Sequence, residues 1–386
     1  MRDILIVCPQ ERDFRVIEAA AVDARFRIRY VGPDLDRVDT FDAPAIVAEC
    51  EALPAHGVAG TKDRSALLAA IVAERRGLPG PTTSAIVNCQ HKPTSRSIQL
   101  GVAPDATPAF ALLDGRLPEF GPPWIVKPVV GRLSQEVRRV SDASALATIH
   151  EQGGYRGGYA RVAGLTGLPE ESVHGFLVEQ LVEGDEVTLE GYVHEGRVTV
   201  IGVTDSVKYP GTDSFWRFEY PSALSAERQD ELAAIAGRIV PALGFEGGFF
   251  NVEFVVPSAG PAKVIEINGR IASQFAPLVQ AVHGRSTYEA LCALHGGEDP
   301  AWDANTERGV AISYVMRVFE DAYVESVPEP EDDLEVLVRP GLRLSEQGTN
   351  DAESFRLAIF TEWAETREQA AEQCEARADR LPFELR

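Results

Sequence analysis

The sequence predicts a chain of mixed α/β and α+β class, with an amino-terminal α/β domain followed by β-rich lobes. Residues 4–9 (ILIVCP) form a short continuous apolar run, which is typical of a strand buried on both faces. Strand and helix patterns alternate over roughly the first 85 residues, as in a small parallel α/β unit. The later segments are mostly β-rich, and 386 residues are enough for two or three domains with their own cores.

The amino-terminal unit is predicted to contain a second strand and two helices after the first strand. Residues 14–26 carry a helical pattern, and residues 27–33 (RIRYVGP) predict a second strand. Residues 65–80 (SALLAAIVAERRGLPG) predict a strong helix closed by glycine and proline. No G-x-G-x-x-G motif follows the first strand, so no dinucleotide site is predicted there.

The middle of the chain predicts a helix, a strand pair and a β-rich stretch. Residues 91–110 indicate a helix that stops at a glycine, followed by a proline-punctuated strand. Residues 122–137 read strand, loop, strand, and the glycine-rich residues 153–159 (GGYRGGY) indicate a mobile loop. Residues 176–207 contain three β-rich segments separated by turns at Gly184 and at residues 195–196.

The last third begins with a helix over residues 225–244, for which Ser225 is the expected N-cap. Residues 248–272 predict a β-hairpin. From about Trp302, residues 310–319 and 355–363 predict strands, and an Ala/Glu/Arg-rich helix ends the chain.

The net charge excludes one class of partner. The chain carries 37 Lys and Arg against 59 Asp and Glu, a formal charge of −22. Such a field repels polyanions, so we expect no nucleic acid and no anionic membrane as main partner, although a few local lysines can still hold a single nucleotide.

The five cysteines and the amino terminus indicate a cytoplasmic protein. The cysteines are odd in number, widely spaced and form no C-x-x-C pair, which predicts buried free thiols rather than disulfides or a zinc knuckle. The apolar run near the amino terminus is too short for a signal peptide or a membrane span. We therefore expect a soluble protein located in the cytoplasm.

Two glutamates are predicted to face each other across the hairpin. Glu253 alternates with apolar neighbours in NVEFVV, and Glu266 and Asn268 do so in KVIEINGR. If the strands pair symmetrically about the PSAGPA loop, Glu253 lies directly opposite Glu266, with Cβ atoms about 4.5–5.5 Å apart. Carboxylates this close repel each other unless a cation lies between them.

Two carboxylates and an amide oxygen on a rigid hairpin suit Mg²⁺, which keeps further positions for water and phosphate oxygens. The alternative is an ordinary solvated face with surface charge. The flanking Phe, Val and Ile residues make the hairpin a core element, so its acids must line a cleft or a surface, and the opposed register favours the metal.

The segments CQHKPTSR, WIVKPVVGRLSQEV, VEQLVEGDE and the acidic hairpin occur in the order found in the ATP-grasp superfamily. From about Cys89 to Gly297 the chain resembles the carboxylate–amine ligases of that superfamily, in particular amino-acid ligases. The resemblance implies an ATP-grasp fold, with a Rossmann-like pre-ATP-grasp domain ahead of two lobes that clamp ATP. The implied domains are residues 1–88 (pre-ATP-grasp domain), 89–178 (central lobe), 179–301 (second lobe with the metal site) and 302–386 (extension packed on the second lobe).

The resemblance also implies an ATP-binding set: Lys92, Lys127, Ser134, Glu179, Leu181, Val182 and Glu186. Lys92 would touch a phosphate, and Lys127 the α-phosphate and adenine. Glu179 would accept from the adenine amino group, while the backbone of Leu181 and Val182 pairs with the ring edge. Glu186 would hold the ribose hydroxyls. The loop after Lys127, where Ser134 could cap the phosphates, departs from the family in having a single glycine.

In the second lobe, the resemblance implies magnesium ligands and catalytic groups. Glu253, Glu266 and Asn268 match the family's metal ligands. Arg270 falls where a guanidinium steadies the transferred phosphate, and Lys208 would reach the ATP phosphates from a flexible loop.

Four further residues are implied to lie near the substrates. By analogy with relatives, Ser273 and Gln274 would face the acyl-phosphate region, and Glu219 would contribute to substrate choice. Arg317 is a single charge within an apolar strand pattern; it either binds a substrate carboxylate or pairs internally.

The implied reaction is ATP-dependent ligation of a small-molecule carboxylate to an amine, with amino acids as the expected substrates. A carboxylate attacks the γ-phosphate to give ADP and an acyl phosphate, and the amine then displaces phosphate to form an amide or peptide bond. The cofactors would be ATP and Mg²⁺, for which Mn²⁺ could substitute, and homodimers are common in the family.

Three alternatives remain at this stage: a biotin-carboxylase-like enzyme that activates bicarbonate, a non-catalytic ATP-binding regulatory protein, and a simple phosphotransferase. No carrier-lysine segment is present, which weighs against a fused carboxylase carrier. The joint presence of the acidic pair, Asn268 and Arg270 weighs against loss of catalysis. The sequence contains no P-loop, G-x-S-x-G or H-E-x-x-H motif.

Overall fold

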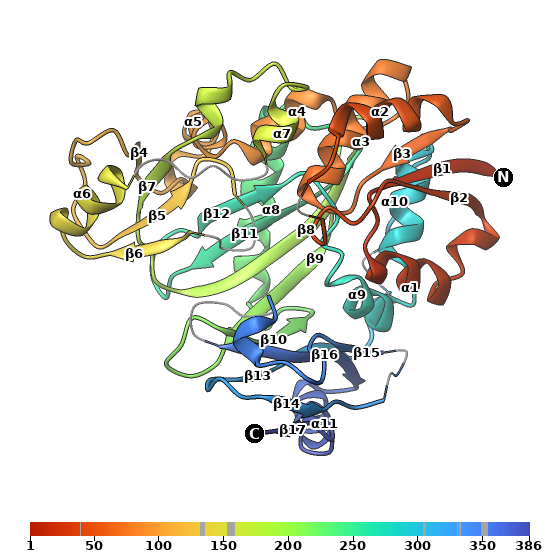
Figure 1. Ribbon diagram of the computed structural model, residues 1–386. Coiled ribbons are helices and arrows are strands. Elements are labelled where there is room, and N and C mark those ends of the chain that lie inside the picture. Colours follow the sequence, from red (N-terminus) through yellow and green to blue (C-terminus); the bar gives the residue numbers. More distant parts are fainter. Residues whose placement is uncertain are drawn as a thin grey trace.

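The structure is a computed structural model that describes residues 1–38, 40–131, 136–152, 159–303, 306–329, 331, 333–348 and 354–386. Within these residues the strands form four sheets. A large sheet runs through the middle of the molecule, with the amino-terminal unit on one side and a smaller sheet on the other (Figure 1). Seventeen strands and eleven α-helices are present in the described part of the chain.

The amino-terminal unit is a parallel three-stranded sheet in the order β2-β1-β3, as the alternating pattern predicts. Its strands are β1 (Arg2–Val7), β2 (Phe26–Val31) and β3 (Gly57–Ala59). Its helices are α1 (Glu11–Ala19), α2 (Ala43–Ala52) and α3 (Asp63–Arg76), with the short 3-10 helix η1 (Val22–Ala24) after α1. The residues of β1 from Ile4 onward are fully buried, which explains the continuous apolar run.

The first helix is shorter than its pattern predicts. It ends at Ala19, because Ala21 adopts a left-handed conformation with φ +49° and cannot continue a right-handed helix. Phe26, which the sequence pattern places in the same helix, is instead the first residue of β2 and is only 2% exposed. Burial of this ring in the sheet overrides the local helical pattern.

The smaller sheet is antiparallel, in the order β4-β7-β5-β6. Its strands are β4 (Phe110–Leu112), β5 (Trp124–Pro128), β6 (Arg138–Val140) and β7 (Phe176–Gln180). The accompanying helices are α4 (Thr83–Gln90), α5 (Lys92–Val102), η2 (Pro104–Ala106), α6 (Ala143–Glu151), α7 (Ala160–Ala163) and η3 (Glu170–Val173). Trp124 and Val178 of the sheet share a small core with Leu146 and Ile149 of α6.

The large sheet has eight antiparallel strands in the order β12-β11-β8-β9-β10-β13-β16-β15. The strands are β8 (Asp185–His194), β9 (Arg197–Lys208), β10 (Phe215–Tyr220), β11 (Phe249–Val256), β12 (Lys263–Asn268), β13 (Val310–Val318), β15 (Leu334–Val336) and β16 (Phe355–Ala364). The carboxy-terminal strands thus continue the same sheet rather than only packing on it. The remaining strands, β14 (Val324–Ser326) and β17 (Glu384–Leu385), pair with each other.

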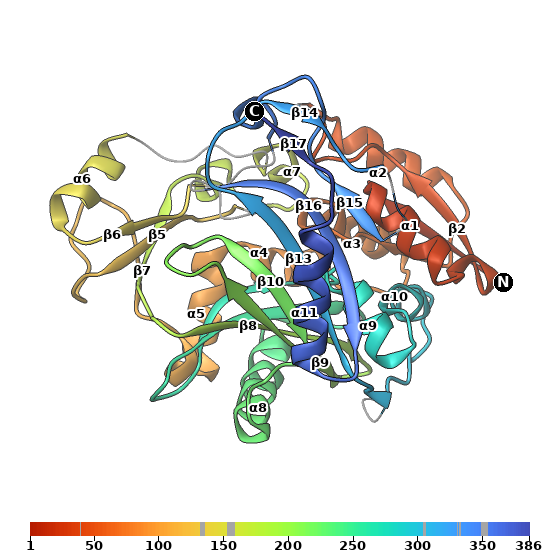
Figure 2. The ribbon, with the colours of Figure 1, turned by 90° about the horizontal axis from the view of Figure 1, so that it is seen from below.

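Helices cover the large sheet on both faces. They are α8 (Ala226–Ala242), α9 (Ala276–His283), α10 (Thr287–His295) and α11 (Arg367–Ala378), and η5 (Leu344–Glu346) lies in the carboxy-terminal part. Ser225 caps α8 by accepting from the backbone N–H of Arg228, as predicted. Phe254 of β11 and Leu232 of α8 belong to one buried cluster, and α11 lies over β13 and β16 (Figure 2). Successive strand residues point to opposite faces, so Glu253, which precedes Phe254 on β11, points to the other side of the sheet.

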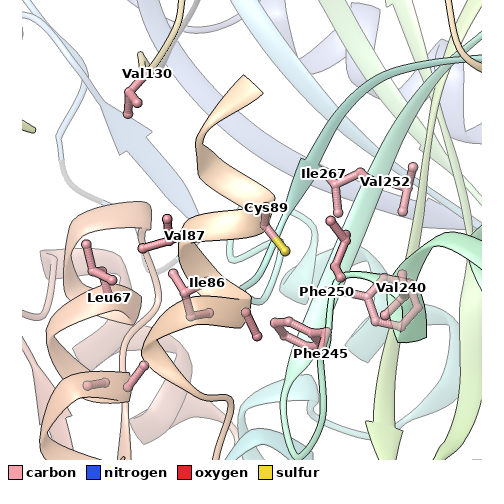
Figure 3. Packing of buried hydrophobic residues seen from close by; sticks show 14 of the residues in the cluster. Leu67, Ile86, Val87, Cys89, Val130, Val240, Phe245, Phe250, Val252 and Ile267 are labelled. Carbon is pink, nitrogen blue, oxygen red and sulfur yellow. The ribbon is translucent and has the colours of Figure 1, made fainter. Parts of the chain in front are cut away.

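The acidic hairpin is held against α4 by close packing. Ile86 and Cys89 of α4 lie beside Phe245, Phe250 and Ile267 (Figure 3). A Cβ atom at Gly269 would lie 2.8 Å from Phe245 and 2.9 Å from Ile86, a distance that real Cβ atoms do not adopt. Glycine is therefore required at the end of β12, and this contact fixes the position of the residue that follows.

All five cysteines are free and buried, as the sequence predicts. No helix in the described part of the chain combines the length and apolar character needed to cross a membrane.

Replacing Phe254 by alanine should destabilise the fold strongly. The ring is fully buried beneath α8, so its removal deletes apolar contacts and leaves a cavity. We expect the free energy of unfolding to fall by about 3–5 kcal/mol, measured by urea denaturation. Phe319→Ala is the control, since that ring is 44% exposed and its loss should cost less than about 1 kcal/mol. Equal losses in the two variants would contradict this account of the core.

Candidate active site

The predicted opposition of the two glutamates is confirmed. Glu253 pairs with Glu266, and Asn251 pairs with Asn268. The predicted symmetric register fails nearer the loop, because the pairing shifts by one residue between Glu253 and Phe254. Ile265 is the extra residue on β12, so the hairpin contains a β-bulge directly beside the acidic pair.

The bulge creates a binding point for cations. Ile265 has no opposite residue on β11, and its carbonyl oxygen accepts from Nη2 of Arg96 at 2.6 Å and from Nζ of Lys127 at 3.2 Å. Arg96 comes from α5 and Lys127 from β5. The bulge therefore connects the acidic hairpin to two elements of the smaller-sheet region.

Cations and an amide surround the two carboxylates. Nζ of Lys92 lies 2.8 Å from Oε1 of Glu266, and Nδ2 of Asn268 donates to Oε1 of Glu253 at 3.0 Å. Burial, and next the charge of Glu266, raise the pKa of Glu253 well above its ordinary value. An added divalent cation would relieve this unfavourable burial of negative charge.

The donor set fits Mg²⁺ better than a softer metal. The described residues contain no group of three or more His, Cys, Asp or Glu side chains placed to hold a metal ion. Two carboxylates and the amide oxygen of Asn268 are hard oxygen ligands, and so few protein ligands leave positions for water and phosphate oxygens. Glu253, Glu266 and Asn268 could therefore hold a magnesium ion.

Glu179 lies in a buried ionic cluster. Its carboxylate accepts from Nε of Arg96 at 2.5 Å and from Nζ of Lys127 at 2.6 Å, and the side chains of all three are at most 6% exposed. Burial raises the pKa of Glu179, but the two cations outweigh burial and lower it overall. Arg96 was missed from the sequence, although it lies one helical turn after Lys92 on α5 and so shares its face.

The segment after β7 offers fewer free backbone groups than the resemblance implies. The N–H of Leu181 already donates to the carbonyl oxygen of Pro123 at 3.0 Å. A contact of that N–H with an adenine ring is therefore not available in this structure, while the contact through Val182 remains a prediction.

Lys208 at the end of β9 forms an ion pair with Glu186 of β8. Nζ of Lys208 lies 2.6 Å from Oε1 of Glu186 and 3.4 Å from Oδ1 of Asp213. Asp213 in turn pairs with Arg139 of β6 at 2.5 Å. The loop between β9 and β10 thus contacts the smaller sheet at the side of the site where the ribose contact is predicted.

Arg270 is oriented by the amino-terminal unit. Its Nε donates to Oδ1 of Asp63, the first residue of α3, at 2.7 Å. Its backbone carbonyl accepts from Nδ2 of Asn251 at 3.0 Å. Burial lowers the pKa of Arg270, but Asp63 and then the acidic pair raise it overall, so the guanidinium stays charged. Asp63 is a second site residue that sequence reasoning missed.

Two of the predicted substrate residues do not face the acidic pair: Glu219 lies on the opposite face of the sheet, and Arg317 makes internal contacts. Glu219 pairs across the sheet with Asp205, and that register places it on the face of Phe254, opposite to Glu253. There it accepts from Nε of Arg217 at 2.5 Å and from Nη1 of Arg367 at the start of α11. Arg317 makes internal contacts, the second of the two expected alternatives.

Arg317 donates from Nε to the carbonyl of Phe215 and from Nη1 to Ser354, both at 2.8 Å. Ser273 is buried and Gln274 exposed in the segment between β12 and α9, immediately after Arg270. Ser134 and residues 153–158 of the predicted glycine-rich loop lie outside the residues that the structure describes.

A buried glutamate beside the site was also missed. Glu190 pairs with Asn251 in the β8–β11 ladder, and its Oε1 accepts from the N–H of Ala272 at 2.6 Å. Its Oε2 is buried and has no hydrogen-bond partner among the described residues. Burial raises the pKa of Glu190 to about 8. A protonated Glu190 thus holds the segment that follows Arg270.

Glu190 should make stability pH-dependent. The unfolded chain loses this proton near pH 4.5, whereas the folded chain keeps it to about pH 8, so the free energy of unfolding falls as the pH rises between these values. Glu190→Gln keeps the acceptor for Ala272 but cannot ionise. Between pH 5 and 8, wild type should lose on the order of 3 kcal/mol relative to this variant, measured by chemical denaturation. Parallel pH profiles would show that Glu190 ionises normally in the folded protein.

Comparison with known proteins identifies the domain around this site. Residues 120–277 match the family model of the ATP-grasp domain. A curated relative, "Uncharacterized protein y4rH" of Sinorhizobium fredii (strain NBRC 101917 / NGR234), is 27% identical over 337 residues, which are 82% of this chain. The match spans 66% of that relative's length.

Solved structures share the fold over the whole chain. An L-amino acid ligase from Bacillus licheniformis has a TM-score of 0.77 at 19% identity, covering 100% of this chain and 99% of the other. The biotin carboxylase domain of the Hydrogenobacter thermophilus 2-oxoglutarate carboxylase, in complex with MgADP, ADP and bicarbonate, has a TM-score of 0.73 at 15% identity, covering 100% and 91%. Phosphoribosylglycinamide synthetase from Anaerococcus prevotii has a TM-score of 0.69 at 15% identity, covering 100% of both chains. The predicted ATP-grasp fold is confirmed.

Proposed function

We propose that this ATP-grasp protein is an ATP-dependent carboxylate–amine ligase that forms an amide or peptide bond through an acyl phosphate. The observation that carries the proposal is the opposition of Glu253 and Glu266 on one hairpin, with Lys92 arriving from α5 and Arg270 following the end of β12. Paired acids surrounded by cations are suited to a nucleotide phosphate chain carried by a divalent ion.

Each charged group has a role in this proposal. Mg²⁺ held by Glu253, Glu266 and Asn268 would neutralise charge on the transferring phosphoryl group. Lys92 and Lys127 place ammonium groups at the hairpin, where they would bind phosphate oxygens. Arg270, oriented by Asp63, would stabilise the acyl phosphate.

The nucleoside would lie between β7 and the loop after β9. Glu186 is placed to accept from ribose hydroxyls, and Lys208, now paired with it, would move toward the phosphates when ATP binds. Glu179 would contact adenine while keeping its pairs with Arg96 and Lys127. The buried cluster then acts as a fixed floor for the ring rather than as a free acceptor.

In the first step a carboxylate oxygen attacks the γ-phosphorus and ADP leaves. In the second, the amine nitrogen attacks the acyl carbon, phosphate leaves, and the amine loses a proton to solvent. Amino acids are the substrates we expect, in keeping with the fold shared with an L-amino acid ligase.

Phosphate release in a screen of carboxylates crossed with amines tests the reaction. Release that needs one carboxylate together with one amine supports ligation. Release with bicarbonate alone would instead favour the carboxylase-like alternative, for which the shared fold with a biotin carboxylase domain is the supporting observation. Accumulation of a stable phosphorylated product would favour a phosphotransferase.

Glu266→Ala should abolish turnover while leaving the fold intact. The change removes one carboxylate of the proposed metal site and the partner of Lys92. We expect the rate of ADP formation to fall by about 100-fold or more, with an unchanged circular dichroism spectrum. Glu372→Ala, an exposed acid on α11, is the control and should keep the wild-type rate. A Glu266→Ala variant with wild-type turnover would refute the metal assignment.

A further inference from the structure

The chain uses lysine sparingly. Of its 37 basic Lys and Arg residues only five are lysines: Lys62, Lys92, Lys127, Lys208 and Lys263. Three of these belong to the site described above, and Lys263 donates to the carbonyl of Asp105 at 2.5 Å. Lys62 is the remaining lysine, and no role or partner has yet been described for it.

Lys62 lies between β3 and α3, immediately before the aspartate that orients Arg270. Its side chain is partly buried, and its backbone N–H donates to Ser65. Its ammonium group makes no hydrogen bond or ion pair with any residue that the structure describes. The nearby charges that lower its pKa are Arg12 and Arg270, so it faces other cations.

The carboxylates around Lys62 are already used. Asp13 accepts from the Gln10 N–H at 2.6 Å, from Thr61 at 2.8 Å and from the hydroxyl of Tyr288. Asp63 binds Arg270. The third carboxylate is Glu335 of β15, in the carboxy-terminal part of the chain.

That third carboxylate, Glu335, accepts from Nε of Arg12 at 3.2 Å and from Nη2 at 2.6 Å, and it lies 3.5 Å from Arg15. Arg12, Arg15 and Arg270 each have a carboxylate partner here, and Arg270 also faces Glu253 and Glu266, whereas Lys62 is the cation of this cluster that has none among the described residues. Burial first, and then Arg12 and Arg270, lower the pKa of Lys62 to about 8. A partly buried ammonium group without a partner is unusual in a chain of net charge −22, which offers many carboxylates.

We infer that the Lys62 ammonium binds a substrate carboxylate other than the one that is phosphorylated. The inference rests on the proposed ligase function, because the reacting carboxylate must lie at Arg270 and the acidic pair. A second carboxylate on the Lys62 side of the Asp63–Arg270 pair would complete the cluster. One unpaired ammonium group matches one carboxylate, whereas a phosphate dianion would leave negative charge unpaired. At least one substrate is therefore an amino acid or a dicarboxylic acid.

Binding to the full-length protein with MgADP tests this assignment without requiring turnover. The probes are the common L-amino acids and succinate, each compared with its amide, and the readout is the shift in melting temperature with ligand concentration. We expect at least one carboxylate probe to stabilise wild type, while its amide does not. Stabilisation by an amino acid places the carboxylate on an amino-acid substrate, and by succinate alone on a dicarboxylic acyl substrate.

Variants assign the effect to Lys62. In Lys62→Met the apparent affinity for the stabilising probe should fall about 10- to 100-fold, and Lys62→Arg should retain most of it. Lys263→Met, a lysine outside the cluster, should bind as wild type does. In turnover assays Lys62→Met should raise the KM for that substrate and leave the KM for ATP unchanged. Melting without ligand checks that each variant is folded.

The assignment is overturned if no carboxylate probe stabilises the protein, if amides stabilise it equally, or if Lys62→Met binds as wild type does. Phosphate release from a carboxylate and an amine would still support the ligase in those cases. The proposed function fails separately if no such pair releases phosphate.

Discussion

The structure depends on one electrostatic constraint: two partly buried carboxylates face each other on a single hairpin and must be compensated. Glu253 and Glu266 cannot stay ionised and buried together unless positive charge surrounds them. Lys92 of α5 and Arg270 at the end of β12 supply it, and Asp63 of the amino-terminal unit orients Arg270. Segments far apart in the sequence are therefore drawn to the same hairpin.

The parts predicted correctly from the sequence are those governed by local periodicity. Alternation fixed the face of each hairpin residue, and a short loop limited the possible registers, so the opposition of Glu253 and Glu266 could be predicted. The one-residue bulge at Ile265 could not be predicted, because neither alternation nor loop length shows where a strand takes an extra residue. The end of α1 was missed as well, because Ala21 adopts a left-handed conformation and Phe26 is buried in β2 despite the helical pattern.

Residues missed or misplaced from the sequence depend on long-range contacts. Arg96, Asp63 and Glu190 acquire their roles only when separate elements meet, and no spacing along the chain reveals those meetings. Glu219 shows the converse. The resemblance implied a role in substrate choice, whereas the sheet register turns Glu219 toward α11, where it binds Arg217 and Arg367. Face and partner, rather than residue type, decide such a role.

The carboxy-terminal strands have a consequence for how the chain can be divided. β13 pairs along β10, and β16 and β15 extend the ladder beyond it, so residues after Val310 complete the same sheet that carries the acidic hairpin. A fragment ending before β13 would leave the backbone N–H and C=O groups of β10 without partners along an open edge. Such an edge is a template for intermolecular pairing, which makes the fragment prone to aggregate. The part of the chain that carries the acidic hairpin is thus not a separable module.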